Sequence, residues 1–173
     1  MQQSQDLAWL NELGPAEARA ELLKCCGATR WAETIEQRRP YASLEQLLAT
    51  ASDVWWGLDQ ADWLEAFRSH PKIGEQKAAN AVSAQSQKWS AQEQQGVQQA
   101  APDTVEKLAK LNLDYEKKFG FIFIVCATGK SSDEILALLE KRLPNEPAAE
   151  LPIAAGEQAK ITELRLRKLL GIP

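Results

Sequence analysis

The single histidine of the sequence, His70, is the first candidate for chemistry. An imidazole with an ordinary pKa of about 6.5 can give or take a proton near neutral pH. His70 stands in the stretch SHPKIGE, after a run with helical periodicity and directly before Pro71. Because a residue before proline is disfavoured in the α region, the helix should end here and hold His70 exposed but fixed at the start of a loop. A lone histidine is more often structural or merely exposed, and on these residues alone that alternative stays open.

Arg165, in the stretch KITELRLRKLL, is a second candidate. A guanidinium group is planar and can hold a carboxylate through two parallel hydrogen bonds. The alternative is a solvated helix face on which Arg165 packs beside Ile161, four residues earlier.

Ser90 and Glu93 have the spacing of a capping box, which predicts that a helix begins at Ser90. The N-terminus of a helix presents unpaired N–H groups and a partial positive charge, so it also suits an anionic ligand. The cap alone would explain both residues.

The triplet Gly129-Lys130-Ser131 invites a nucleotide-binding interpretation, which the spacing does not support. A phosphate-binding loop needs a second glycine five residues before Gly129, and Ile124 stands there. We therefore expect Ser131 and Glu134 to cap the next helix.

Composition excludes several classes of function. The chain of 173 residues has a net charge of −4 and no basic stripe, so it is not expected to bind nucleic acid. It has no run of 18 apolar residues and no N-terminal secretory pattern, so no membrane association is expected. Three cysteines (Cys25, Cys26 and Cys126) argue against a disulfide framework and favour the reducing cytoplasm. With one histidine, no metal site is expected.

Helical signals recur along nearly the whole chain and predict an all-α, single-domain bundle of about eight helices over residues 1–173. Ser43, Asp59, Asp103 and Ser131 are the expected N-caps, and Pro152 should begin or kink the last helix. Residues 71–89 are polar and predict a surface loop, with or without a short turn of helix. The apolar run from Phe121 to Val125 predicts one buried extended segment without a partner strand. The helices are expected within 15–26, 28–39, 43–58, 59–70, 90–100, 103–120, 131–143 and 146–170.

Several stretches taken together resemble one family, the 2-oxo-4-hydroxy-4-carboxy-5-ureidoimidazoline (OHCU) decarboxylases of uric acid degradation. The resemblance covers nearly the whole chain and rests on the patterns HPxIG, SxxEQ and KFGFxFIV, which are specific in combination. They fall within residues 39–75, 90–96, 111–146 and 157–170.

The resemblance implies a homodimeric, cofactor-free carboxy-lyase that converts the small-molecule ureidoimidazoline to S-allantoin and carbon dioxide. It implies that His70 is the proton donor and that Glu93 and Arg165 take part in catalysis or substrate binding. The substrate-binding residues that it implies are Pro71, Ser90, Gln94, Phe121, Ile122, Phe123, Ile124 and Val125. The extended segment would contribute apolar wall and unpaired backbone groups.

Two other functions remain open from the sequence. A helical interaction module without catalysis would explain the amphipathic pattern equally well. A different lyase or hydrolase acting on the same ureide chemistry would use similar side chains.

Overall fold

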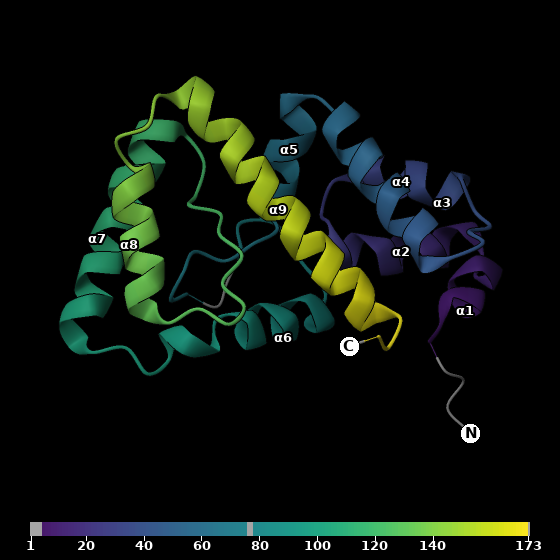
Figure 1. Ribbon diagram of the computed structural model, residues 1–173, viewed down its shortest axis with the longest axis horizontal. Coiled ribbons are helices and arrows are strands. Elements are labelled where there is room, and N and C mark those ends of the chain that lie inside the picture. Colours follow the sequence, from purple (N-terminus) through teal and green to yellow (C-terminus); the bar gives the residue numbers. More distant parts are fainter. Residues whose placement is uncertain (1–4, 76–77, 173) are drawn as a thin grey trace. The chain divides into compact units, whose positions relative to one another are not determined.

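The computed structural model describes residues 5–75 and 78–172 and confirms the all-α fold. Over these residues the chain forms nine α-helices and one short 3-10 helix, η1, and the described backbone holds no strand beyond an isolated bridge between Pro71 and Ala78 (Figure 1). The elements are α1 (Leu7–Glu12), α2 (Pro15–Cys25), α3 (Thr29–Gln37), α4 (Leu44–Gly57), α5 (Gln60–Phe67), α6 (Ala84–Glu93), η1 (Gln95–Val97), α7 (Pro102–Phe119), α8 (Ser132–Arg142) and α9 (Pro147–Leu169).

The helices fall into two compact units. The first comprises residues 1–66 and 159–173, and the second comprises residues 67–158, so α9 contributes residues to both. The single domain expected over 1–173 stays a prediction.

The first unit is held together by the packing of α3 against α2 and α4. Trp31 of α3 is fully buried, and its indole N–H donates to the carbonyl of Ala51 in α4 at 3.1 Å. The N-terminus of α3 has no capping side chain of its own. Instead Glu65 accepts from the backbone N–H of Thr29 at 2.8 Å and from its hydroxyl at 2.9 Å, so a carboxylate from α5 supplies the missing cap.

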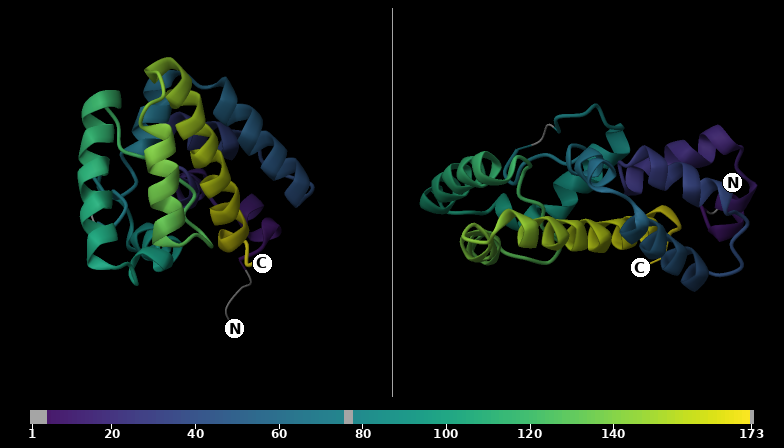
Figure 2. Two further views of the ribbon diagram at one scale, coloured as in Figure 1. Left: turned by 60° about the vertical axis from the view of Figure 1, so that its left-hand side comes forward. Right: turned by 90° about the horizontal axis from the view of Figure 1, so that it is seen from above.

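The second unit has its core where α7 packs against α8, and the two helices lie side by side in Figures 1 and 2. Tyr115 of α7 is fully buried and contacts the rings of Phe119 and Phe123, with centroids 4.4 and 5.3 Å apart. Ile135 and Leu139 of α8 close this core. Their spacing of four residues is that of one helix face.

Three of the expected N-caps are confirmed, because each side chain accepts a hydrogen bond from the backbone N–H three residues later. Ser43 accepts from the N–H of Gln46, Asp59 from that of Asp62, and Ser131 from that of Glu134. The glycine–lysine–serine triplet therefore ends at the start of a helix, as expected, with Ser131 as its N-cap.

Three expectations about helix boundaries are wrong. Ser90 does not begin a helix but lies in the last turn of α6, which begins after Ser83 because Ser83 accepts from the N–H of Ser86. The expected loop over 71–89 is therefore helical from Ala84, where alanine, glutamine and lysine favour helix. Asp103 lies in the first turn of α7 instead of capping it, because Pro102 occupies the first helical position.

The N-terminal helix α1 was not predicted, and it begins where Asp6 accepts from the N–H of Trp9. In α9, Pro147 is the first residue and Pro152 lies inside the helix. No helix in the described ranges is both long and apolar enough to span a membrane.

Candidate active site

His70 follows α5 after one further turn, with its backbone N–H donating to the carbonyl of Phe67 at 3.1 Å. The residue is only 9% exposed, so the expectation of an exposed histidine is wrong. Its ring Nε2 lies 2.6 Å from the side-chain Oε1 of Gln158, a fully buried residue of α9. The ring is therefore fixed by a residue 88 positions later in the chain.

The segment after His70 is held by two side-chain amides of the second unit. The Oε1 atom of Gln94 accepts from the backbone N–H of Gly74 at 2.9 Å. The Nδ2 atom of Asn112, which is buried in α7, donates to the carbonyl of Ile73 at 3.2 Å. Two consecutive residues are thus bound from two different elements, which restricts the loop that carries His70 and Pro71.

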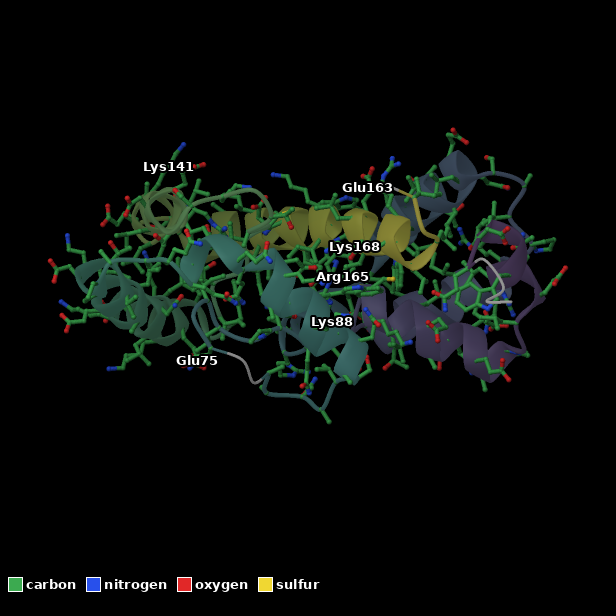
Figure 3. The ribbon with its side chains drawn as sticks, turned by 90° about the horizontal axis from the view of Figure 1, so that it is seen from below. Glu75, Lys88, Lys141, Glu163, Arg165 and Lys168 are labelled. Atoms are coloured by element: carbon green, nitrogen blue, oxygen red, sulfur yellow. The ribbon has the colours of Figure 1, made fainter. Side chains whose placement is uncertain are left out.

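A cavity of about 600 Å³ opens beside this loop. Its volume falls in the range of small-molecule sites, and its wall combines apolar side chains with a few polar groups. The residues that line it come from the loop, α6, η1 and α7: Pro71, Lys72, Ile73, Gly74, Glu75, Ala84, Gln87, Lys88, Ser90, Ala91, Gln94, Val97, Gln98, Val105, Leu108, Ala109, Asn112 and Leu113. Glu75 and Lys88 of this lining are labelled in Figure 3.

The cavity brings together Pro71, Ser90 and Gln94, three residues that the resemblance places in a substrate site. His70 and Glu93 are each adjacent in sequence to a lining residue without lining the cavity themselves. Lys72 of the lining forms a 2.8 Å ion pair with Glu116, and this hydrogen bond raises the pKa of the lysine. The wall contributed by α7 was not predicted from the sequence.

The segment from Phe121 to Val125 forms neither helix nor strand, with a bend at Phe121, and it is buried from Phe123 onward. The expectation that its backbone groups are unpaired is wrong at Ile124, whose carbonyl accepts from Arg142 at 2.7 Å. The next residue, Cys126, is held at both ends of its backbone: its N–H donates to Glu157 at 3.2 Å and its carbonyl accepts from Lys130 at 2.7 Å. Side chains, and not a partner strand, therefore bind these backbone groups of Ile124 and Cys126.

A buried polar cluster on α8 and α9 anchors the extended segment, and the sequence interpretation missed it. Arg142 and Glu150 form an ion pair at 2.6 Å, and the Tyr115 hydroxyl donates to the same carboxylate. Burial and this hydrogen bond raise the pKa of the Tyr115 phenol. A usable signal existed: Arg142 continues the buried face of Ile135 and Leu139 at helical spacing.

Arg165 belongs to the first unit and is 3% exposed, so a solvated helix face is the wrong interpretation of this residue. Its Nη1 donates to the carbonyl of Lys24 at 3.1 Å. Figure 3 labels Arg165 on α9 together with Glu163 and Lys168, which are exposed. Burial raises the pKa of the Cys26 thiol to about 12, although the Arg165 charge opposes this shift.

The predicted residues thus divide between the two units, with Arg165 in the first and the others in the second. Within the part of the chain that the structure describes, no group of three or more histidine, cysteine, aspartate or glutamate residues is arranged to hold a metal ion.

Residues 11–167 match the family model described as OHCU decarboxylase. The chain belongs to the OHCU decarboxylase family. Two curated relatives illustrate the match. A uric acid degradation bifunctional protein of Arabidopsis thaliana is 40% identical over 85% of this chain and 45% of its own length. A 2-oxo-4-hydroxy-4-carboxy-5-ureidoimidazoline decarboxylase of Amia calva is 33% identical over 78% of this chain and 77% of its own length. The chain therefore spans less than half of the Arabidopsis protein.

Solved structures agree with this membership of the OHCU decarboxylase family. A crystal structure of an OHCU decarboxylase in the presence of (S)-allantoin has a TM-score of 0.74 and 38% identity, and covers 88% of this chain and 98% of that one. A structure of an (S)-allantoin synthase has a TM-score of 0.72 at 19% identity over 95% of this chain and 53% of that one, and supports the fold alone.

Proposed function

We propose that this protein decarboxylates 2-oxo-4-hydroxy-4-carboxy-5-ureidoimidazoline to S-allantoin and carbon dioxide in uric acid degradation. The observation that carries the proposal is the family match over residues 11–167. The curated relative from Amia calva bears the name of this activity, and the chain covers 77% of it. The geometry of the second unit supports the same function. The ring of His70 is fixed by a hydrogen bond, and the next residue, Pro71, lines a cavity of small-molecule size together with Ser90 and Gln94.

The proposed reaction needs a group that accepts the electron pair of the broken bond to the carboxylate. It also needs an acid that delivers a proton to one face of C5. When the bond between C4 and the carboxylate breaks, its electron pair forms a C4=C5 bond and displaces the ring C=N electrons onto nitrogen. The nitrogen then gains a proton, and the 4-hydroxyl loses one as it becomes a carbonyl. C5, the carbon that bears the ureido group, receives a proton on one face, which sets the S configuration. Because the substrate's own ring accepts the pair, we propose that the enzyme needs no organic cofactor or metal.

We propose His70 as the donor of the proton to C5, with water restoring it afterwards. A positioned acid contributes about 10²- to 10⁴-fold to a rate. Glu93 and Gln94 are proposed to bind the hydroxyl, ring N–H and ureido groups, and Ser90 and Pro71 to complete the wall. The segment Phe121 to Val125 is proposed to contribute apolar wall and the backbone groups that the protein leaves available.

Arg165 is proposed to bind the substrate carboxylate or a carbonyl through its guanidinium group. Its burial supports this role, because a buried guanidinium is held in place and its charge is weakly screened. We also propose, on the resemblance, that the protein is a homodimer in the cytoplasm. Sedimentation velocity of the purified chain measures the oligomeric state, and a monomer would contradict the first of these points.

The test generates the unstable substrate in situ from uric acid and follows the circular dichroism of allantoin. We expect the protein to produce S-allantoin above the racemic background, and we expect His70→Asn to lose most of this activity while remaining folded. Glu163→Gln, on an exposed part of α9, is the matched control and should retain the activity. Absence of optical activity above background would contradict decarboxylation, and a fully active His70→Asn would contradict the role of His70.

A further inference from the structure

Gln158 of α9 is a buried polar residue whose side chain contacts the ring of His70. It is 0% exposed and lies on α9 next to Ala154 and Ala155, which are also fully buried. A buried amide without a hydrogen-bond partner costs free energy, so a glutamine in this position must be satisfied by its surroundings. Its Oε1 lies 2.6 Å from Nε2 of His70.

The chemistry of the amide determines which ring nitrogen carries hydrogen. An amide oxygen can only accept a hydrogen bond, so Nε2 of His70 must donate in this contact. Neutral His70 is then the Nε2–H tautomer, with its lone pair on Nδ1. In the imidazolium form both nitrogens carry hydrogen, and the proton that is gained and lost is the one on Nδ1.

We propose that Gln158 is a positioning residue that holds hydrogen on Nε2 of His70 and thereby makes Nδ1 the atom that donates the proton to the substrate. This inference rests on the proposed function of His70 as the acid. In the transfer step the Nδ1–H bond breaks and the C5–H bond forms. The imidazole remains as the Nε2–H tautomer, still bound to Gln158, and Nδ1 regains a proton from water. The ring therefore does not rotate or change tautomer during the cycle.

The backbone around Gln158 is suited to this role because two other residues of α9 are bound to residues outside the helix. The neighbouring Glu157 accepts from the N–H of Cys126 at 3.2 Å, directly after the extended segment. Eight residues before Gln158, Glu150 is bound to Arg142 in the buried cluster. Because the helix is anchored at both positions, the amide of Gln158 has little freedom to move away from the ring.

The presence of a single histidine makes the inference directly measurable. In a tag-free sample labelled with nitrogen-15, every imidazole signal comes from His70. At a pH above the titration of the ring, we expect the nitrogen shifts of the wild-type protein to show one tautomer, with hydrogen on Nε2. A spectrum that shows hydrogen on Nδ1 would overturn the proposal. This measurement is made without substrate, so it stands or falls separately from the decarboxylase function.

Two substitutions separate positioning from packing. Gln158→Met keeps a side chain of similar length without an acceptor, and we expect mixed tautomers and a kcat lower by about 10- to 100-fold, because part of the population carries the proton on the wrong nitrogen. Gln158→Glu keeps an oxygen acceptor and should keep the Nε2–H tautomer. Gln37→Met, at an exposed position at the end of α3, is the control and should change neither measurement.

The outcomes are decisive for both variants. If Gln158→Met keeps the wild-type tautomer and the wild-type kcat, Gln158 only packs and the proposal is wrong. If Gln158→Met does not fold, the wild-type spectrum and Gln158→Glu still test it, and loss of the Nε2–H tautomer in the folded Gln158→Glu variant would overturn it. If neither the wild-type protein nor any variant produces S-allantoin, but the wild-type spectrum shows hydrogen on Nε2, the proposed decarboxylase function is wrong. The inference that Gln158 controls the tautomer of His70 would still hold.

Discussion

Arg142 binds both Glu150 and Ile124: its Nη2 lies 2.6 Å from the carboxylate of Glu150, and its Nη1 donates to the carbonyl of Ile124 at 2.7 Å. The same side chain therefore connects the buried ion pair to the segment Phe121 to Val125, which is proposed to form part of the substrate site. Asn145 donates to the second oxygen of Glu150 at 2.9 Å, so both carboxylate oxygens are bound.

We expect Glu150→Gln to destabilise the protein strongly. The amide would leave the charge of Arg142 buried without its counter-ion, and breaking one partner of a buried pair costs about 3–5 kcal/mol. Urea denaturation measures the change in the free energy of unfolding. Glu163→Gln is the control, because Glu163 and Arg167 form an exposed pair at 3.2 Å, and its loss should cost less than about 1 kcal/mol. Equal effects of the two substitutions would contradict the buried cluster as an anchor.

Gly96 is the glycine at which a side chain has no room. An added Cβ would lie 2.1 Å from the carbonyl oxygen of Lys130, a backbone atom directly before the cap of α8. We expect Gly96→Ala to lower the free energy of unfolding by about 1–3 kcal/mol, as overpacking does, measured by thermal denaturation. Gly57→Ala has no heavy atom within 4 Å of the new Cβ and is the control. A Gly96→Ala variant as stable as Gly57→Ala would show that η1 does not approach residue 130 this closely.

The sequence predicted those features whose signals are local, and it missed those that depend on distant partners. Ser43 and Ser131 were assigned correctly because their partners lie three residues away. The start of α6 was predicted wrongly because Ser83 and Ser90 can each cap a helix, and the local sequence does not show that Trp89 and Ser90 are buried inside α6. Gln158 could not be assigned from spacing, because its partner His70 is 88 positions away.

The buried thiols should react slowly at a pH where an ordinary thiol reacts quickly. Burial raises the pKa of Cys26 to about 12 and also raises the pKa values of Cys25 and Cys126. A raised pKa leaves little reactive thiolate at pH 8, about 1 part in 10⁴ for a pKa of 12, and the reactive fraction increases as the pH rises toward the pKa. Colorimetric titration of the native protein with a disulfide reagent at pH 8 should therefore be slow, and unfolding in guanidinium should release three fast thiols.

An Ala49→Cys variant supplies the matched control for thiol reactivity, because Ala49 is exposed on α4. Its added thiol should react in the native protein while the other three stay slow. Fast native reaction of more than one thiol in this variant would contradict the burial of the natural cysteines.

Asn112 tests whether the loop beside the cavity must be held for the proposed activity. Replacing it with leucine keeps the volume but removes the donor to the carbonyl of Ile73, which is then left without that hydrogen bond, at a cost of about 1–3 kcal/mol. We expect the loop that carries His70 and Pro71 to lose its fixed position, so that KM for the substrate rises and kcat falls. Progress curves of S-allantoin formation give both parameters. Lys110→Gln, exposed on the same helix, should leave them unchanged. If Asn112→Leu loses stability but retains both kinetic parameters, the α7 wall supports the fold without positioning the site.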